Sequence, residues 1–228
     1  MLSLEEAVEK LLQSVKPIAG DESASIADAI GRVVAEDVLA PSPLPAFDNS
    51  AMDGWAVRSA DVQGASADSP VTLECITKVP AGGTFSGTIG AGQCARIFTG
   101  SPLPTGADAV VMQEDTRAEL PKVQILDAVK PWENIRFRGE DVKEGSFIAR
   151  RGDRVAPQMA ALFSACGVSE VKVKRRVRVA VLATGNELKE PGAKLTAGEI
   201  YESNRILIAS LLSRLGMEAI VKPIVVDE

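Results

Sequence analysis

The sequence predicts a multidomain α+β and α/β protein. A β-rich domain, barrel-like or sandwich-like, is inserted into a mixed α/β framework, and a βαβ unit follows. Three observations predict this organisation. Apolar residues near the N-terminus recur with a helical period, and glycine and proline punctuate short β-like runs between residues 41 and 140. The continuous apolar run Val177–Ala183 is typical of a buried parallel strand.

The N-terminal segment predicts a helix over residues 3–15. Ser3 and Glu6 have the spacing of a capping box. One apolar stripe runs along this helix, so we expect that face to dock elsewhere. A second short helix is expected over residues 25–30, and a strand over residues 32–40.

The middle of the chain predicts a compact all-β unit because short strands alternate with turn residues. The expected strands are Val71–Lys78, Cys94–Phe98, Ala109–Gln113 and Lys122–Val129.

The chain then returns to mixed structure. Pro157 suits a helix start, Gly167 a helix stop, and residues 168–174 a strand. Basic residues gather between Lys172 and Arg178. They are interpreted as a solvated linker strand, with contact to an anionic ligand as the alternative.

The C-terminal segment predicts one βαβ unit: the strand at 177–183, a helix over 203–215 and a strand over 219–226. A single unit of this kind leaves strand faces uncovered. We therefore expect the chain to be an N-terminal piece of a longer protein.

Composition excludes several function classes. A net charge of −6 and an aromatic content of 4% argue against nucleic-acid binding, and no apolar run reaches the ~18 residues of a membrane span. The chain contains no histidine, which excludes Ser–His–Asp and Cys–His catalysis within it. Three widely spaced cysteines predict a reducing, cytoplasmic setting. Carboxylates, hydroxyls and cationic side chains remain, and they suit hard metal ions and phosphate-like substrates.

Two stretches of the middle segment carry candidate side chains. In Phe47–Trp55, Asp48 is interpreted as a loop carboxylate bonded to backbone, whereas Asp53 is a candidate to hold a metal or a substrate group. In Arg96–Pro104, the hydroxyls of Thr99 and Ser101 predict an oxyanion-binding loop, with a simple turn as the alternative.

Two further stretches carry charge. Arg136 and Arg138 lie close in sequence to Glu140 and Asp141. They form either surface salt bridges or a site in which the arginines bind phosphates and Asp141 is a site carboxylate. Glu187 follows the first parallel strand, at the edge where doubly wound folds bind ligands, and a turn or helix-cap acid is the alternative.

These stretches occur together and in order, and on them the sequence resembles the molybdopterin molybdenumtransferase family, the molybdenum insertases of molybdenum-cofactor biosynthesis. The matching runs are FDNSAMDGW (47–55), RIFTGSPLPTGAD (96–108), AVVMQE (109–114), NIRFRGED (134–141), RVAVLATGNEL (178–188) and EIYESN (199–204). Two departures are Trp55, where tyrosine is more common, and Asn186, where aspartate is usual.

The resemblance implies a cytoplasmic, elongated homodimer that inserts molybdate into adenylylated molybdopterin with Mg²⁺ and releases AMP. It implies functional roles for Asp53, Thr99, Asp141 and Glu187. Ser101, Arg136 and Arg138 join Thr99 as expected substrate-binding residues. The active site would lie between the β-rich domain of one subunit and the third and fourth domains of its partner.

The resemblance also sets domain boundaries. Residues 1–24 form an N-terminal helix that docks on the third domain, and residues 177–228 begin a truncated molybdopterin-binding domain. Residues 25–45 and 142–176 form the framework, and residues 46–141 the inserted domain. Most of the third domain and all of the fourth are missing, so we expect this chain to be inactive alone. The alternative is a non-catalytic scaffold that dimerises or binds a receptor or another partner.

Overall fold

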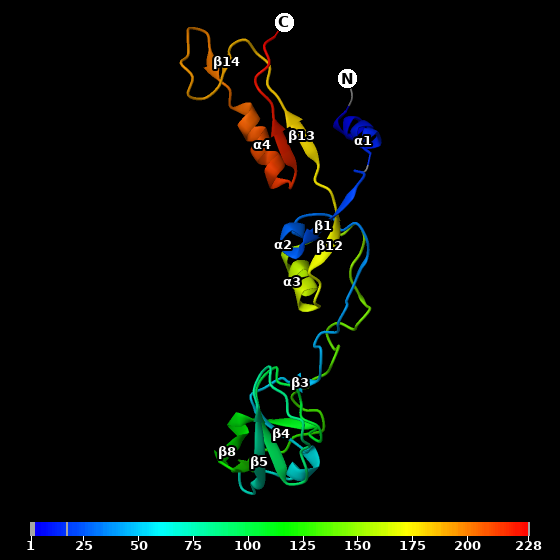
Figure 1. Ribbon diagram of the computed structural model, residues 1–228, viewed down its shortest axis with the longest axis vertical. Helices are drawn as coiled ribbons and strands as arrows, with labels where there is room; N and C mark the ends of the chain where they lie inside the picture. Colours follow the sequence, from blue (N-terminus) through cyan, green and yellow to red (C-terminus); the bar gives the residue numbers. More distant parts are fainter. Residues whose placement is uncertain (1–2, 17, 228) are drawn as a thin grey trace. The chain divides into compact units, whose positions relative to one another are not determined.

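The computed structural model describes residues 3–16 and 18–227, and the chain divides into two compact units (Figure 1). The framework unit consists of residues 1–38, 147–164 and 168–228. The β unit consists of residues 39–146 and 165–167. The chain therefore leaves the framework unit and re-enters it, while the finer four-part division stays a prediction. No helix of the described residues is long and apolar enough to cross a membrane.

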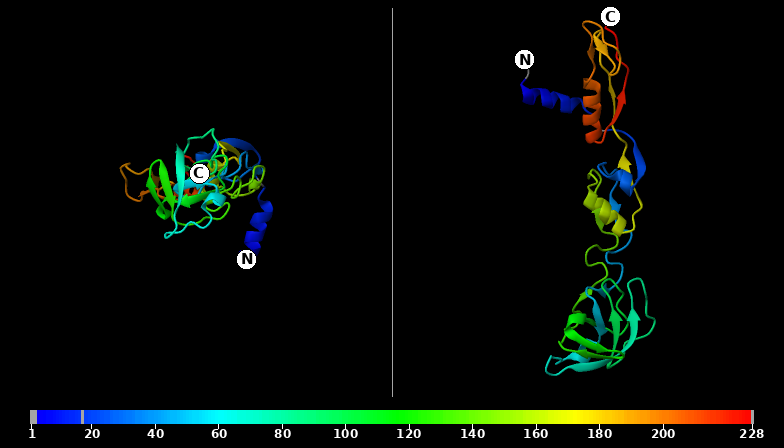
Figure 2. Two further views of the ribbon diagram at one scale, coloured as in Figure 1. Left: turned by 90° about the horizontal axis from the view of Figure 1, so that it is seen from below. Right: turned by 90° about the vertical axis from the view of Figure 1, so that its left-hand side faces the viewer.

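A six-stranded sheet forms the β unit, in the order β7-β4-β6-β5-β9-β8, and it curls around its interior (Figure 2). Neighbouring strands are antiparallel except β5 and β6, which are parallel. The strands are β4 (Gly54–Val57), β5 (Val71–Val79), β6 (Gln93–Ile97), β7 (Ala109–Met112), β8 (Thr116–Glu119) and β9 (Lys122–Ile125), with short helices η1 (Ser59–Val62) and η2 (Gln113–Asp115). The predicted β-rich unit and its four expected strands are confirmed, although β9 is shorter than expected.

Two apolar clusters form the core of this sheet. One gathers around Trp55, Cys94 and Val123, and the other around Ile97 and Val110. β4 and β7 are buried along almost their whole length, whereas β5 and β9 alternate between buried and exposed residues, as expected for strands with one solvent-facing side.

Gly54 is the first residue of β4 and lies opposite Met112 of β7. A Cβ atom there would lie 1.9 Å from the backbone oxygen of Val111. Only glycine leaves room for this strand pair, which positions the loop before β4.

We expect Gly54→Ala to lower the free energy of unfolding by at least about 3 kcal/mol, since overpacking against main chain leaves no side chain that can move aside. Urea unfolding measures this loss. Gly64→Ala is the control: Gly64 has φ +85° but open space, so it should lose only about 1 kcal/mol. Equal losses would contradict the steric explanation.

The framework unit begins with α1 (Leu4–Ser14), and its predicted capping box is present. The Ser3 hydroxyl accepts from the Glu6 amide at 3.2 Å, and the Glu6 carboxylate accepts from the Ser3 amide at 2.8 Å. No residue of α1 is buried, so docking of its apolar stripe stays a prediction.

Antiparallel strands β1 (Asp21–Ser25) and β12 (Glu170–Lys174) form the centre of the framework unit, with the helices α2 (Ile26–Ala29) and α3 (Pro157–Ala165) beside them. The two helices and β12 are confirmed. Strand β1 was not predicted, because its residues DESAS are mostly polar and show no apolar alternation.

The strand expected over residues 32–40 is largely wrong. Only β2 (Val38–Leu39) is a strand in this segment. It forms a two-stranded sheet with β11 (Phe147–Ala149). The amide of Val34 donates to Asp153 while that of Ala35 donates to Lys172. Backbone bonds to two different partners keep this segment extended without forming a regular ladder.

The predicted βαβ unit is confirmed. Strand β13 (Arg178–Val181) pairs in parallel with β16 (Glu218–Val221), and α4 (Asn204–Arg214) packs against both. The connection after β13 also contains a short parallel pair, β14 (Leu188–Lys189) and β15 (Ile200–Tyr201). The apolar residues Ile206, Leu207 and Leu211 of α4 are exposed.

The cysteines differ in accessibility. Cys94 and Cys166 are buried, and Cys75 is half-buried. Burial first, and the neighbouring Cys75 second, raise the pKa of the Cys94 thiol to about 12. Burial also raises the pKa of Cys166.

We expect iodoacetamide at pH 8 to modify Cys75 well before Cys94 or Cys166, because the thiolate is the reactive form. Peptide mass spectrometry of the native protein measures the order of labelling. In Cys75→Ser, labelling of the native protein should be slow. After denaturation, the two remaining thiols, Cys94 and Cys166, should both be labelled. Early modification of Cys94 would contradict the burial described here.

Candidate functional site

Three loops that are far apart in the sequence meet at strand β3 (Asn49–Ser50). The amide of Ser50 donates to the Ser101 carbonyl at 3.0 Å, and the Gly100 amide donates to the Ser50 carbonyl at 2.9 Å. On the other side, β3 pairs antiparallel with β10 (Ile135–Arg136). Since backbone groups of a strand point alternately to its two sides, β3 joins both loops by main-chain bonds alone.

Asp53 and Thr99 are in direct contact. Both the amide and the hydroxyl of Thr99 donate to Asp53 Oδ1, at 2.8 and 2.9 Å. These two donors, the amide first, lower the pKa of the Asp53 carboxyl, and the positive charge of Arg96 lowers it further. Asp53 therefore stays ionised at neutral pH, and its Oδ2 accepts no hydrogen bond from the described residues.

Arg136 binds two acids of its own loop. Its guanidinium donates to Glu140 Oε1 at 2.6 Å and to Asp141 Oδ2 at 2.5 Å. The Phe137 amide and Arg136 lower the pKa of Glu140, in that order. The geometry shows the salt bridges that the sequence allowed as one interpretation. The contact of Arg136 and Asp141 with a substrate stays a prediction.

The remaining predicted residues of these loops have local partners. Arg138 pairs with Glu144 at 2.9 Å, and its amide donates to Asp48 Oδ1 at 2.7 Å, so Asp48 ties its own loop to the third loop. Ser101 is fully buried, and its hydroxyl has no partner among the described residues. In this arrangement Thr99 is exposed to an incoming ligand and Ser101 is not.

Glu187 lies in the framework unit, whereas Asp53, Thr99 and Asp141 lie in the β unit. Its exposed carboxylate folds back over Gly185, where a Cβ atom would lie 2.7 Å from Glu187 Oε2. Nearby, Asn186 donates to the carbonyl of Asp227 at 3.4 Å and accepts from its amide at 3.1 Å. An aspartate at position 186 would lack the donor for the first bond.

Glu202 of the matched run EIYESN forms a buried ion pair with Arg205, the residue that follows the run. Arg205 donates to Glu202 at 2.8 Å, to Glu190 at 2.7 Å and to the carbonyl of Lys222 at 2.6 Å. Arg205 and Glu202 are both buried. This network joins the start of α4 to β16 and to the loop after β14, so the run has a structural role here.

The described residues contain no group of three or more carboxylate or cysteine side chains placed to hold a metal ion. Asp53 offers one free carboxylate oxygen, which is a ligand type that Mg²⁺ accepts. Mg²⁺ usually keeps several waters and takes one or two carboxylates with substrate phosphates. One oxygen from Asp53 fits such a site in part, and Mg²⁺ stays a prediction.

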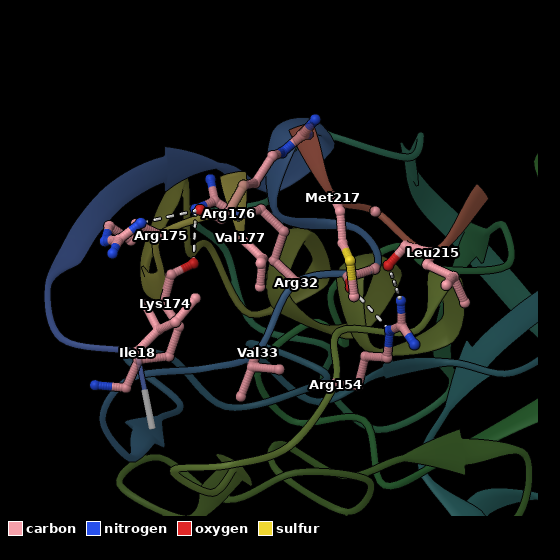
Figure 3. A pocket seen from close by; sticks show the side chains of 12 residues that line it. Ile18, Arg32, Val33, Arg154, Lys174, Arg175, Arg176, Val177, Leu215 and Met217 are labelled. Carbon is pink, nitrogen blue, oxygen red and sulfur yellow. Dashed lines mark hydrogen bonds between the residues drawn. The ribbon is translucent and has the colours of Figure 1, made fainter. Parts of the chain in front are cut away.

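The basic run faces a pocket of about 350 Å³ in the framework unit (Figure 3). Within the run, Lys172 pairs with Glu36, Lys174 with Asp21 and Arg178 with Glu218. Arg32 Nε is buried without a partner among the described residues. Most of the charge of the run is therefore neutralised locally, which favours the structural interpretation.

Comparison with known proteins identifies the family. A profile described as the MoeA N-terminal region (domain I and II) matches residues 2–167. Molybdopterin molybdenumtransferase of Haemophilus influenzae is 39% identical over 221 residues, which is 96% of this chain and 54% of that protein. Molybdopterin molybdenumtransferase 2 of Mycobacterium tuberculosis is 40% identical over 212 residues, which is 93% of this chain and 51% of that protein.

A solved structure agrees with these matches. The crystal structure of the molybdopterin biosynthesis MoeA protein from Pyrococcus horikoshii OT3 gives a TM-score of 0.87 at 35% identity, over 98% of this chain and 60% of that chain. The fold and these matches define a protein of the molybdopterin-biosynthesis class. Within that class, the chain belongs to the MoeA family, and it spans about half the length of the curated relatives it matches.

We expect the Asp53 carboxyl to titrate below the ordinary range of aspartate, because Thr99 stabilises its charged form. Stability from this contact is then present above the unfolded-state pKa and is lost as the pH falls through the folded-state pKa. Carbon-13 NMR of the aspartate carboxyls measures the midpoint. Thr99→Val should raise this midpoint only in part, since the hydrogen bond from the backbone amide of residue 99 to Asp53 remains.

Thr72→Val is the matched control, because Thr72 is exposed on β5 and makes no contact with Asp53. An Asp53 midpoint that is the same in Thr99→Val and in Thr72→Val would contradict the contribution of the Thr99 hydroxyl.

Proposed function

We propose that this chain acts in molybdenum-cofactor biosynthesis as part of a molybdopterin molybdenumtransferase. The reaction inserts molybdate into adenylylated molybdopterin, cleaves its phosphoanhydride and releases AMP. Membership of the MoeA family supports the assignment. The Asp53–Thr99 contact is the observation that carries it, because a fixed, ionised carboxylate with one free oxygen lies within a matched motif.

The charge of Asp53 limits what it can do. Molybdate and phosphates are anions, so a bare carboxylate would repel them. We propose that Asp53 holds a cation beside these anions or accepts a hydrogen bond from an N–H group of the pterin. A bound Mg²⁺ supplies Lewis-acid stabilisation of the phosphoanhydride. Thr99 keeps the carboxylate deprotonated and oriented through its two hydrogen bonds.

Further parts of the proposal concern assembly. We propose a cytoplasmic homodimer in which residues outside this chain, including those of a partner subunit, complete the site. Asp141, Arg136 and Arg138 would act from the β unit and Glu187 from the framework unit, whereas the buried Ser101 would support its loop. The chain alone should then show no turnover, because the residues that complete the proposed site lie outside it.

A chimera tests the proposed function. Residues 1–228 replace the matching half of the Haemophilus influenzae relative, and molybdenum insertion is followed with adenylylated molybdopterin, Mg²⁺ and molybdate. We expect the chimera to be active. Asp53→Asn should lower kcat by about a hundredfold, comparable to losing one preorganised electrostatic group.

Asp68→Asn is the matched control, since Asp68 is exposed and lies away from the three loops. It should keep the rate of the unmodified chimera. A wild-type rate for Asp53→Asn would show that Asp53 is structural, and turnover by the 228-residue chain alone would overturn the shared site.

The exposed apolar stripe of α1 supports one alternative, a dimerising scaffold without catalysis. The exposed residues are Leu4, Val8, Leu11, Leu12 and Val15. Sedimentation of the chimera distinguishes the two: a stable dimer that inserts no metal would favour the scaffold.

A further inference from the structure

A second pocket, of about 750 Å³, opens on the β unit; Arg96 lines it, whereas Asp53 and Thr99 do not. Its apolar wall includes Ile76, Leu120, Pro121 and one side of Trp55. Leu120 is 70% exposed and Ile76 is 37% exposed. Apolar side chains this exposed around a concave surface are typical of a ligand site.

Two cations lie directly opposite each other at this pocket. Lys78 on β5 is the register partner of Arg96 on β6, and both line the pocket. Like charges placed opposite each other destabilise a sheet. Neither forms an ion pair with a described residue. Arg96 donates only to neutral groups, the Gly54 carbonyl at 3.0 Å and Gln113 Oε1 at 2.5 Å.

Aromatic rings hold the two cations in place. The guanidinium of Arg96 lies 5.3 Å from the centre of the Trp55 ring and 4.8 Å from that of Phe98. Lys78 Nζ lies 5.2 Å from the centre of Phe98. Cation–π contacts stabilise each charge but do not neutralise it. The pair therefore presents two preorganised positive charges.

A β-bulge creates this pairing. The β5–β6 register shifts between Cys75 and Thr77, so that Ile76 is an extra residue. Without it, the pairing of Cys75 with Cys94 would continue and bring Thr77 opposite Arg96. The bulge brings Lys78 there instead. Bulges that re-aim a side chain are frequent beside binding sites.

We propose that this pocket binds a small planar aromatic molecule that carries a phosphate monoester. The phosphate lies between Lys78 and Arg96, since guanidinium and ammonium groups are the usual phosphate partners. The ring lies against Ile76 and Leu120, beside the indole of Trp55. The proposal does not depend on the proposed function. Because the whole chain has a net charge of −6, general attraction of anions does not account for such binding.

Tryptophan fluorescence tests the proposal with phenyl phosphate as the probe. The chain has two tryptophans, so Trp132→Phe leaves Trp55 as the reporter. We expect phenyl phosphate to quench Trp55 saturably, with inorganic phosphate and phenol each binding at least tenfold more weakly. Lys78→Gln should raise the Kd for phenyl phosphate about tenfold. Ile76→Ser should raise the Kd for phenyl phosphate and leave the Kd for inorganic phosphate unchanged.

Lys122→Gln is the charge-matched control, because Lys122 is exposed on β9 and does not line this pocket. Circular dichroism and urea unfolding confirm that each variant folds. The proposal fails if quenching does not saturate, if inorganic phosphate binds as tightly as phenyl phosphate, or if Lys122→Gln weakens binding as much as Lys78→Gln. Failure here leaves the Asp53 experiment unaffected, since that experiment measures metal insertion in a different protein.

Discussion

The two-sided hydrogen bonding of β3 is the interaction on which the candidate site depends. Ser50 uses its own amide and carbonyl to hold the Gly100–Ser101 turn, while the Ala51 amide donates to the carbonyl of Asn134 on the other side. Main-chain bonds of this kind fix distance and direction with little dependence on side chains. The side chains of the loops are therefore free to carry charge, as Asp53 and Arg136 do, or to hydrogen-bond a charged neighbour, as Thr99 does.

Cationic side chains of the β unit are organised in two ways. Arg136 and Arg138 are each paired with a carboxylate, so their loop is nearly neutral. Arg96 and Lys78 are not, and the cost of holding them together remains in the folded state. Unpaired charge of one sign is expected where a ligand of the opposite sign binds, whereas the paired charges of Arg136 and Arg138 fix the shape of their loop.

Sequence patterns predicted the elements that depend on periodicity or on capping. The capping box at Ser3 and Glu6, the glycine stop at Gly167 and the apolar run of β13 all act over a few residues, so the sequence displays them. Strand β1 depends on its partner β12 for pairing, and its polar residues show no period. The prediction of a strand over residues 32–40 was wrong for the opposite reason. The residue pattern there suits a strand, but the backbone partners do not form a ladder.

Prediction of the candidate site reached a similar limit. The motifs indicated that Asp53 and Thr99 carry function, and the structure places them in contact. The roles of Asp141, Arg136 and Glu187 are still predictions, because a motif states which residues occur and not which partners they take. Lys78 was missed, since only the register shift at Ile76 brings it opposite Arg96. No local pattern in the sequence marks a bulge of this kind.

The place where the chain enters and leaves the β unit has a consequence for folding. The amide of Ala40 donates to the carbonyl of Ser146 at 2.8 Å, and the Gly145 amide donates to the carbonyl of Ala40 at 2.9 Å. The two ends of the segment 40–146, which contains the six-stranded sheet of the β unit, are thus hydrogen-bonded to each other. Once the β unit has formed, the rest of the chain is connected across it as if by a short hairpin turn, and most of the loop-closure entropy has already been lost. An order of assembly follows, in which this segment closes first and residues that flank it then find each other as near neighbours along the chain.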